Sequence, residues 1–528
     1  MTESTDTFDH IIVGSGINSL VCAALLARRG DRILLLERND RLGGCIRTEE
    51  LTAPGFIHDV LSNWHPLFVT SPAYAELKDD LEKYGLEYCN TDRPTAAILP
   101  DQSYCILKTS REENVANFNA LSAGDGDRYQ QSLSELEQSL DLTFTLLGNE
   151  FWRWGTAKVF LAALIKRGPV FLSRYFASCL ENGRNWLERD FNSEAAAACF
   201  ATWPAHTGMS PDATTSGQMA RIIAFTLEMA GCPVVKGGGF RLVQAFEQLI
   251  RAHDGAIRLN ADVVQVRTED GRATGVELGD GTAFHATKSV ICSTTPAQLY
   301  QRLLDPAVVP EPIAQQTRAF RHGRADMQIH LALDAPPEWV QDELGQVAIV
   351  HVTPGLNGVS RAMNEADRGL LPAEGTVVVG QPAALDPSRV PEGKGLLWIQ
   401  LQELPPRILG DAAGEIDIPP DGNWTESVRE AYADRIVDRL GNHIRGLREH
   451  IIARTVLSPA DLESLNINLV GGDPYGGECS LDQNFLWRPL RGLKNHETPI
   501  RNLYHIGAST HPGPGLGGGS GYLVAKSL

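Results

Sequence analysis

An α/β fold is predicted by three features of this sequence. A strand–helix–strand pattern of about thirty residues begins almost at the N-terminus. Another strand, a glycine-rich loop and a helix pattern lie at the C-terminal end. The chain has 528 residues, which is more than one hydrophobic core supports. We therefore expect an α/β unit built from both ends of the chain and interrupted by an inserted α+β domain.

Composition and charge disfavour several classes of function. The chain has 47 basic and 65 acidic residues, and its net charge of −18 disfavours nucleic-acid partners, which need a basic face. The same charge disfavours loose adhesion to anionic lipid, although a local basic patch is compatible with it. Nine cysteines are dispersed without C-x-x-C or metal-ligand spacing, so we expect reduced thiols and no metal site.

The sequence also shows no pattern typical of a signal peptide or of a membrane-spanning helix. The N-terminal segment MTESTDTFDH is polar and lacks the apolar core of a signal peptide. No run of ~20 apolar residues occurs, and the closest stretch, 159–180, is broken by Lys166, Arg167, Gly168 and Pro169. We expect a cytoplasmic protein and leave peripheral membrane contact open.

The N-terminal pattern is that of a dinucleotide-binding turn. A β-branched strand from His10 to Val13 leads into Gly14, and a helix runs from Ile17 to about Arg29. A second apolar strand, 33–36, then ends at Glu37. Glu37 lies 23 residues after Gly14, where a carboxylate accepts hydrogen bonds from a ribose.

The turn itself reads G-x-G-x-x-S. Gly14 permits the tight turn, and Gly16 lets the backbone approach a pyrophosphate at the positive end of the helix. Ser19 replaces the usual third glycine and is small enough for helix and strand to pack closely. The pattern therefore predicts a Rossmann-type site with contacts from Gly14, Gly16, Ile17, Asn18, Ser19 and Glu37.

The residues after Glu37 favour FAD over NAD. Arg38 and Arg41 precede the pair Gly43-Gly44, which places cations and bare backbone beside the same pyrophosphate. This element is similar to the R-x-G-G element of FAD-binding amine oxidases and carotenoid desaturases. Cys45 follows it, and no second cysteine occurs before Cys89, so a packed thiol is expected rather than a redox disulfide.

The C-terminal pattern closes the same site. A strand from Asn502 to Ile506 enters a glycine-rich loop, and a helix begins near Gly519. A helix N-terminus aimed at the flavin ring stabilises the negative charge of reduced flavin. We expect cofactor contacts here from Gly507, Gly515, Leu516 and Gly517.

Four segments carry a resemblance to a known family. The C-terminal NLYHIGASTHPGPGLGG strongly resembles the FAD signature of bacterial phytoene desaturases. GFIHDVLSNWHPLF, WPAHTGMSPD and LDPSRVPEGKG are similar to segments of phytoene dehydrogenase-related FAD proteins. The resemblance implies a glutathione reductase-like Rossmann domain for FAD, formed by residues 1–75, 233–299 and 491–528. It implies a substrate-binding domain with a helical cap, formed by residues 76–232 and 300–490.

The resemblance also implies individual site residues. A strand pattern after a glycine-rich turn brings Val263 and Val264 to the adenine, and Ser62 with Trp64 approaches the flavin face. Three histidines in family-like motifs are candidate catalytic residues: His65, His206 and His511. Their spacing forms neither a triad nor a metal pattern, and a structural or cofactor-packing role is the commoner explanation for each.

The inserted segments have patterns of their own. Strands are expected at 327–333, 346–352, 376–380 and 396–401, forming a sheet over the flavin. The first insertion is largely helical and contains an aromatic cluster: Phe151, Trp152, Trp154, Phe160, Phe171, Tyr175 and Phe176. Such a cluster is most often core, and the alternatives are an apolar substrate tunnel or a monotopic membrane contact.

These features predict an FAD-dependent desaturase or dehydrogenase. A C–H bond of an apolar or semi-polar substrate would give hydride to flavin N5. The alternatives are a flavin amine oxidase, a redox-neutral flavin isomerase and a non-catalytic lipid-carrier protein on the same fold. The sequence does not identify the electron acceptor, for which oxygen and a quinone are both open.

Overall fold

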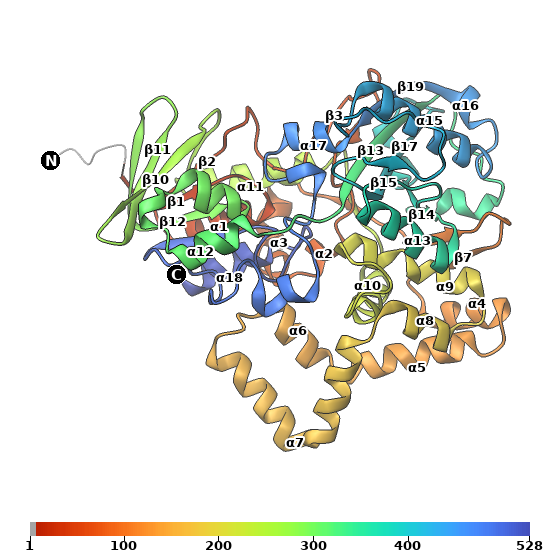
Figure 1. Ribbon diagram of the computed structural model, residues 1–528, viewed down its shortest axis with the longest axis horizontal. Helices are drawn as coiled ribbons and strands as arrows, with labels where there is room; N and C mark the ends of the chain where they lie inside the picture. Colours follow the sequence, from red (N-terminus) through yellow and green to blue (C-terminus); the bar gives the residue numbers. More distant parts are fainter. Residues whose placement is uncertain (1–6) are drawn as a thin grey trace.

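The computed structural model describes residues 7–528 and brings the two ends of the chain into one unit (Figure 1). Residues 1–6 lie outside the described residues. They belong to the N-terminal segment in which the sequence predicts no signal peptide. Strand β1 (Thr7–Val13) pairs in parallel with β2 (Ile33–Leu36) on one side and β12 (Ala283–Ser293) on the other. The C-terminal strand β20 (Leu503–Ile506) pairs in parallel with β12, and β9 (Ala256–Arg258) with β2. This is the α/β core that the sequence predicts.

Helices from distant parts of the chain cover one face of this first sheet. They are α1 (Ile17–Arg28), α3 (Pro72–Lys83), α11 (Phe240–Ala252) and α18 (Gly519–Ser527), and their apolar side chains share one buried cluster. The antiparallel strands β10 (Val263–Glu269) and β11 (Arg272–Leu278) extend the sheet beyond β12. Short connecting segments complete it: π-helical 298–303 and α12 (Glu311–Arg318) pack on the other face.

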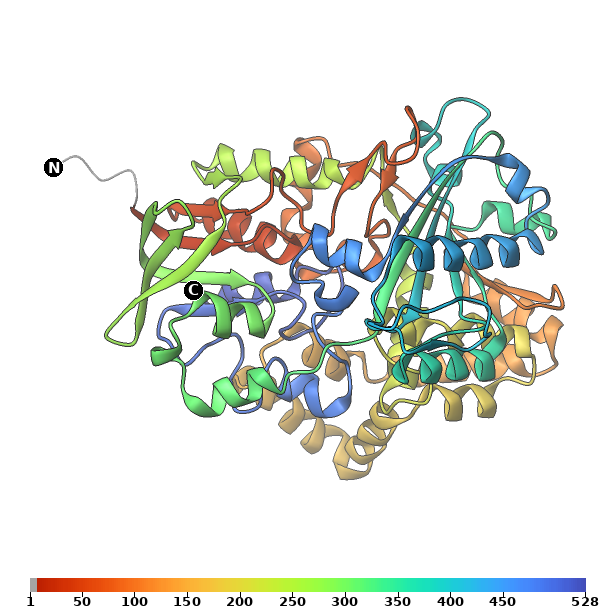
Figure 2. The ribbon, with the colours of Figure 1, turned by 45° about the horizontal axis from the view of Figure 1, so that its top comes forward.

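The inserted segments build a second sheet of seven strands (Figure 2). Its order is β19 (Ile451–Leu457), β13 (Ala325–Leu333), β17 (Gly395–Leu404), β16 (Val377–Gly380), β14 (Ile349–Val352), β6 (Thr95–Ile98) and β7 (Tyr104–Leu107). All four expected strands are present. The strands β6, β7 and β19 were not predicted, because β6 and β7 are four-residue runs and an arginine interrupts β19.

The second sheet has two unlike faces. Side chains alternate along a strand, and one face carries Met327, Ile329 and Leu331 against helix α15 (Glu426–Gly441). The opposite face of β13 carries Asp326, Gln328 and His330, all buried. Burying polar groups costs free energy unless they find partners, so a buried polar face indicates a binding surface.

The remaining elements are mostly helical and surround these sheets. Between β7 and β8 (Val234–Val235) lie α4 (Arg111–Leu121), α5 (Asp125–Glu137), α6 (Leu140–Gly148), α7 (Trp154–Leu180), α8 (Gly183–Asp190), α9 (Glu194–Ala201) and α10 (Ser216–Ala230). Later elements are α13 (Gly355–Asp367), α14 (Pro382–Leu385), α16 (Leu447–His450) and α17 (Pro459–Leu465). Short pieces are α2 (Pro66–Val69), β3 (Thr48–Glu49), β4 (His58–Asp59), β5 (Tyr88–Cys89), β15 (Leu370–Leu371) and β18 (Gly410–Asp411).

Helices α6 and α7 form an arm that extends away from the sheets (Figure 1). Helix α7 bends at Gly168, whose φ is +83°, and Pro169 follows. These are the residues that the sequence predicts to interrupt the apolar stretch. Within residues 7–528, no helix is both long and apolar enough to cross a bilayer.

The aromatic cluster of the arm is only partly core. Tyr175 is buried, and Phe160 and Phe171 pack around it. Trp152, Trp154 and Phe176 are 55%, 67% and 46% exposed, so the expectation that they belong to the core is wrong. Apolar character alone does not determine burial. Helices α6 and α7 pack against each other on one side, and the side chains on their other side are exposed to solvent.

The contact between α1 and α18 predicts the effect of one substitution. A Cβ on Gly521 would lie 1.8 Å from the backbone oxygen of Asn18, so Gly521→Ala must push the two helices apart. We expect a loss of about 1–3 kcal/mol in stability, together with a lower FAD content. Thermal unfolding and flavin absorbance after purification measure both quantities.

Gly441→Ala is the matched control for this substitution. Gly441 also lies in a helix, and a Cβ there meets no atom within 4 Å. The close helix contact is not required if Gly521→Ala and Gly441→Ala unfold at the same temperature and retain the same flavin content.

Candidate functional site

The site begins with two glycine motifs that touch each other. Gly14 has φ +87°, and a Cβ on it would lie 3.1 Å from the backbone oxygen of Ser293, at the end of β12. A Cβ on Gly44 would lie 3.1 Å from the Cα of Gly16. A Cβ on Gly16 itself would meet nothing within 4 Å among the described residues other than its chain neighbours. The bare backbone at Gly16 therefore faces open space, as a pyrophosphate contact requires.

Glu37 connects these two motifs. Its Oε2 accepts hydrogen bonds from the Ser15 backbone N–H at 3.1 Å and from the Ser15 hydroxyl at 2.6 Å. The backbone N–H of Gly43 donates to the Ser15 Oγ at 3.1 Å, and that of Asn39 donates to Glu37 Oε1 at 2.9 Å. The carboxylate predicted at the end of the second strand is thus buried at the turn, where it holds both loops in place.

The N-termini of α1 and α18 meet beside these loops. Neither helix has a side-chain cap or an acidic residue in its first turn. The Gly521 N–H donates to the Asn18 Oδ1 at 3.3 Å. Unpaired N–H groups and the positive helix ends favour an anion at this point. Ser19 is fully buried, and its hydroxyl has no partner among the described residues.

The C-terminal loop shares a neighbour with the N-terminal turn. A Cβ on Gly507 would lie 3.1 Å from the Ser293 Oγ, and the Gly507 N–H donates to the Ser520 hydroxyl at 2.9 Å. Gly14 and Gly507 therefore lie on either side of Ser293, where the parallel strands β1, β12 and β20 end. Further along the loop, a Cβ on Gly515 would meet Leu67 at 2.7 Å, and Gly517 lies beside the same residue. Leu516 packs at the edge of the buried cluster of the first sheet.

The two predicted arginines bind carboxylates in this structure. Arg41 pairs with Glu49 at 2.6 Å and with Asp40 at 3.1 Å, and its side chain is 46% exposed. Arg38 lies 3.7 Å from Asp262. Because both guanidinium groups are directed at carboxylates rather than at the Gly14–Gly16 turn, their role toward a pyrophosphate stays a prediction.

The adenine-side prediction concerns the start of β10. The Ala261 N–H donates to the Glu37 backbone oxygen at 2.8 Å, so the segment before β10 runs along the end of β2. Val263 is buried, whereas Val264 is 39% exposed. This placement brings the start of β10 close to the end of β2, where Glu37 lies.

The segment after β4 faces the polar side of the second sheet. Ser62 donates to the Cys45 backbone oxygen at 2.7 Å, and His330 Nε2 lies 3.1 Å from the Val60 oxygen. Trp64 and Trp398 both lie against Gly380, since a Cβ there would be 3.0 Å from each ring. The segment and the sheet thus enclose one shared region.

Many buried polar atoms in this region have no partner among residues 7–528. They are both side-chain amide atoms of Asn63, Trp64 Nε1, His65 Nε2, Asp326 Oδ1, Gln328 Oε1, His330 Nδ1 and Trp398 Nε1. Buried polar groups are normally paired with protein or ligand. Such a concentration fits a region that a flavin ring and a substrate fill. The open Gly16 backbone and the uncapped helix ends likewise fit the pyrophosphate of FAD.

The three candidate histidines lie in three different places. His65 Nδ1 lies 3.0 Å from the Tyr88 hydroxyl, His206 Nε2 lies 3.0 Å from His351 Nε2, and His511 Nε2 lies 3.1 Å from the Asn149 oxygen. Each ring thus has its own partner in a different segment, and over the described chain the three histidines form no common cluster.

Burial keeps all three imidazoles neutral. It lowers the pKa of His65 to about 4 and that of His511 to about 3. Burial and the neighbouring His351 hold the pKa of His206 well below its ordinary value. A neutral imidazole can accept a proton, and His65 and His511 each keep one unpartnered buried ring nitrogen among the described residues.

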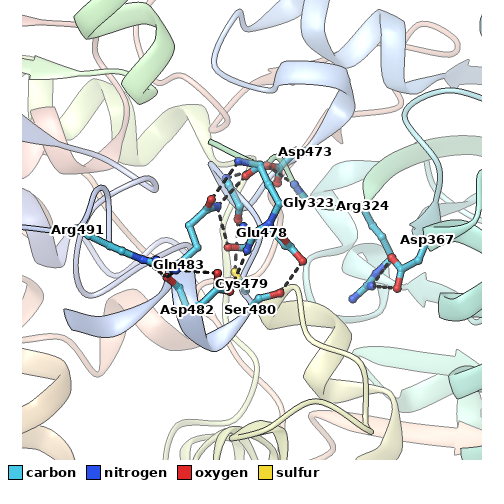
Figure 3. A network of polar contacts seen from close by, with 12 residues as sticks. Gly323, Arg324, Asp367, Asp473, Glu478, Cys479, Ser480, Asp482, Gln483 and Arg491 are labelled. Atoms are coloured by element: carbon cyan, nitrogen blue, oxygen red, sulfur yellow. Dashed lines mark hydrogen bonds and ion pairs between the residues drawn. The ribbon is translucent and has the colours of Figure 1, made fainter. Parts of the chain in front are cut away.

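A network of polar contacts links residues of the loop at 473–491 (Figure 3). The Asp473 carboxylate accepts hydrogen bonds from the N–H groups of Gly323 at 2.9 Å and Gly477 at 2.8 Å. Arg488 donates to the Ala508 oxygen at 2.8 Å, and the Ser509 hydroxyl donates to the Gly476 oxygen at 2.7 Å. The loop therefore braces the chain just after Gly507.

Sequence reasoning missed a buried charge cluster between the two sheets. Arg389 is fully buried and donates to Asp59 at 2.9 Å and to Asp386 at 3.0 Å. Asp59 also accepts from the Gly239 N–H at 2.8 Å. Two of the quoted segments contain members of the cluster: LDPSRVPEGKG includes Asp386 and Arg389, and GFIHDVLSNWHPLF includes Asp59, but neither pattern indicates that they pair. The cluster joins the segment after α14 to β4, to β8 and to the turn before α11.

The structure also places the cysteines and the possible metal ligands. All nine cysteines are free, and burial raises the pKa of Cys45 to about 11, so its thiol is un-ionised. Among the described residues, no group of three or more metal-ligating side chains comes together.

Gly16→Ala separates cofactor binding from folding. Gly16 has φ −63° and ψ 172°, and its Cβ direction is open, so alanine fits the protein without strain. The added methyl group would occupy the space of the pyrophosphate. We expect FAD affinity to fall at least tenfold, measured by titration of the apoprotein.

Stability of the apoprotein is the control for this variant. The free energy of unfolding without FAD should change by about 1 kcal/mol or less, the cost of an altered helix cap. Unchanged FAD affinity in Gly16→Ala would show that the pyrophosphate does not lie at this turn.

The chain is similar to several known flavin proteins and dehydrogenases along most of its length. A family model described as "Flavin containing amine oxidoreductase" matches residues 20–431. The mouse "Pyridine nucleotide-disulfide oxidoreductase domain-containing protein 2" is 24% identical over 98% of this chain and 92% of its own. A limonene dehydrogenase chain of Castellaniella defragrans is 25% identical, over 98% and 94% of the two chains. A lycopene-forming phytoene desaturase of a Paracoccus species is 29% identical, over 98% and 96%.

Solved structures show the same fold at lower identity. Cyclohexylamine oxidase from Brevibacterium oxydans is similar with a TM-score of 0.58 at 15% identity, over 99% of each chain. The relatives confirm the resemblance to phytoene desaturases that the motifs indicate, and the family match confirms a flavin-binding fold.

Proposed function

Because this chain belongs to the flavin containing amine oxidoreductase family, we propose that it is a dehydrogenase or desaturase of a largely apolar small molecule. As a family member it is an FAD-dependent oxidoreductase. Bound FAD supplies a hydride acceptor at flavin N5. The relatives named for limonene dehydrogenase and phytoene desaturase support this choice of substrate class.

The observation that carries the proposal is that burial disfavours charge on the polar face of the second sheet. Asp326 is the acidic residue among the buried polar side chains of β13 and β17 on this face, and burial raises the pKa of its carboxyl well above the ordinary value. Its neighbours Gln328 and Trp398 carry no charge, and burial lowers the pKa of His330 to about 4. A face on which burial disfavours the ionised carboxylate suits an uncharged substrate better than an ammonium ion, whose burial requires a counter-charge.

The protein residues would orient the substrate and exclude water. Trp64 and Trp398, side by side at Gly380, offer aromatic surface with N–H groups that are unpartnered among the described residues. The amides of Asn63 and Gln328 would bind polar atoms of the flavin or the substrate. A neutral His65 or His511 would accept the proton that leaves when a C=C bond forms.

We assign FAD binding to residues 1–75, 233–299 and 491–528, and substrate binding to 76–232 and 300–490. The pairing of β6, from the first insertion, with β14, from the second, supports this division. The cofactor contacts we assign are Gly14, Gly16, Ile17, Asn18, Ser19, Glu37, Arg38, Arg41, Gly43, Gly44, Ser62, Val263, Val264, Gly507, Gly515, Leu516 and Gly517. Oxygen or a quinone would reoxidise the flavin, and a peripheral membrane contact would give access to an apolar substrate.

Anaerobic flavin reduction tests the proposed reaction. Purified protein loaded with FAD is mixed with limonene or phytoene in one series and with cyclohexylamine in another. We expect the visible flavin band to bleach with a hydrocarbon and to persist with the amine. Bleaching by the amine alone would identify an amine oxidase.

Two further outcomes of this experiment would also overturn the proposal. Isomerisation of a polyene without net bleaching, and only after prior reduction of the flavin, would identify a redox-neutral isomerase. Protein that takes up no FAD yet binds the hydrocarbon would identify a lipid carrier.

Substitution of the three histidines tests their part in the reaction. We expect His65→Ala or His511→Ala to slow flavin reduction at least tenfold, because each would remove a candidate proton acceptor. The expected rate is independent of pH above about 5, since the pKa values of about 4 and about 3 leave both rings neutral there. Unchanged rates at equal FAD content in His65→Ala, His511→Ala and His206→Ala would assign a structural role to all three histidines.

A further inference from the structure

The arm formed by α6 and α7 concentrates the exposed apolar surface of the molecule. Seventeen large apolar side chains in the described chain are exposed, and nine of them lie between residues 144 and 180. They are Phe144, Trp152, Trp154, Leu161, Leu164, Ile165, Val170, Phe176 and Leu180. Clustered exposure of this kind marks an interaction surface.

The arm also reverses the charge of the chain. Residues 140–180 contain five basic residues and two acidic ones, Asp141 and Glu150, in a protein of net charge −18. All five are exposed: Arg153, Lys158, Lys166, Arg167 and Arg174. Arg167 pairs with Asp141 at 2.7 Å, whereas the other four form no ion pair within the described chain. The arm is therefore a local cationic patch on an acidic protein.

The elbow of the arm combines both properties. The bend at Gly168 separates two helical limbs and lies at the end of the arm remote from the sheets (Figure 1). Ile165 on one limb is 74% exposed and Val170 on the other is 63% exposed. Lys166 and Arg167 lie between them. Two apolar side chains beside two cations suit the interface of a bilayer, where the apolar groups would contact acyl chains and the cations would contact headgroups.

The root of the arm lies at the glycine-rich C-terminal loop. The Trp152 N–H donates to the Asn495 Oδ1 at 3.0 Å, and the Asn149 oxygen lies 3.1 Å from His511 Nε2. Phe151 packs on the His511 ring with 4.3 Å between centroids. Asn149 and Phe151, at the root of the arm, thus contact His511 in the loop that we assign to the flavin.

We propose that the α6–α7 arm docks this protein on an anionic lipid bilayer, with the elbow inserted at the interface and the basic residues on lipid phosphates. Charge complementarity selects the lipid: a cationic patch on an acidic protein is attracted to anionic headgroups, which repel the rest of the molecule. The contact is monotopic, since α7 bends at its centre and carries cations along its length. It concerns a surface outside the flavin site and does not depend on the reaction proposed above.

Co-sedimentation with vesicles tests this proposal on the FAD-loaded protein. The vesicles contain phosphatidylcholine alone or phosphatidylcholine with phosphatidylglycerol. We expect binding to the anionic vesicles, at least tenfold weaker binding to the neutral ones, and release by salt. No binding of the unmodified protein to anionic vesicles would overturn the proposal.

Two sets of substitutions separate the elbow from the rest of the surface. Ile165→Asp with Val170→Asp, and separately Lys166→Glu with Arg174→Glu, should each weaken vesicle binding at least tenfold. Met229→Asp is the control, because Met229 is 70% exposed at the C-terminal end of α10, whereas α10 meets α7 at its N-terminal end, where the Thr215 N–H donates to the Leu180 oxygen. Equal vesicle binding by the elbow variant and the control would overturn the proposal.

Flavin content and oligomeric state complete the test. FAD absorbance verifies that each variant is folded, and anaerobic flavin reduction without vesicles reports the proposed reaction separately. An oligomer that the elbow variant converts to a monomer, in a protein that binds no vesicles, would instead show that the arm contacts a second copy of this chain.

Discussion

The crossing of α1 and α18 is the contact on which the rest of the structure depends. Gly521 lies so close to the Asn18 carbonyl that only glycine fits, and its N–H bonds the Asn18 side chain across a separation of 503 residues. This contact brings two uncapped helix ends to one point. The buried Glu37 then holds the Gly14 turn and the Gly43–Gly44 loop against each other through Ser15. Three segments that are distant in the sequence thus meet where we propose that the pyrophosphate binds.

The second sheet complements this site through the contrast between its two faces. The face toward α15 is apolar and serves stability, while the opposite face buries polar groups that lack partners among the described residues. Such groups cost free energy unless a ligand pairs with them. The Arg389 cluster joins the segment after α14 to β4 and β8, because Arg389 donates buried hydrogen bonds to Asp59, Asp386 and the Val235 oxygen. The same arrangement leaves the α7 arm outside both cores, with its apolar and basic side chains facing outward.

The local part of this structure was predictable, and the long-range part was not. The Gly14 turn, the helix from Ile17 and the strand before Glu37 follow from short spacings and are found at the predicted residues. The Gly521–Asn18 and Asp59–Arg389 contacts join residues 503 and 330 apart, and no local pattern records such a pairing. The exposure of Trp152 and Trp154 was missed for a related reason: burial depends on what packs against a helix. The polar face of β13 became visible only when alternate residues were placed on opposite sides of a sheet.

Hydrogen–deuterium exchange during titration of the apoprotein with FAD tests most directly whether both ends of the chain enclose one cofactor. Amides of residues 14–19 and of residues 507–521 should gain protection together, at the same FAD concentration, and saturate at one FAD per chain. Protection of one segment without the other, or saturation at different concentrations, would contradict a single site shared by both ends.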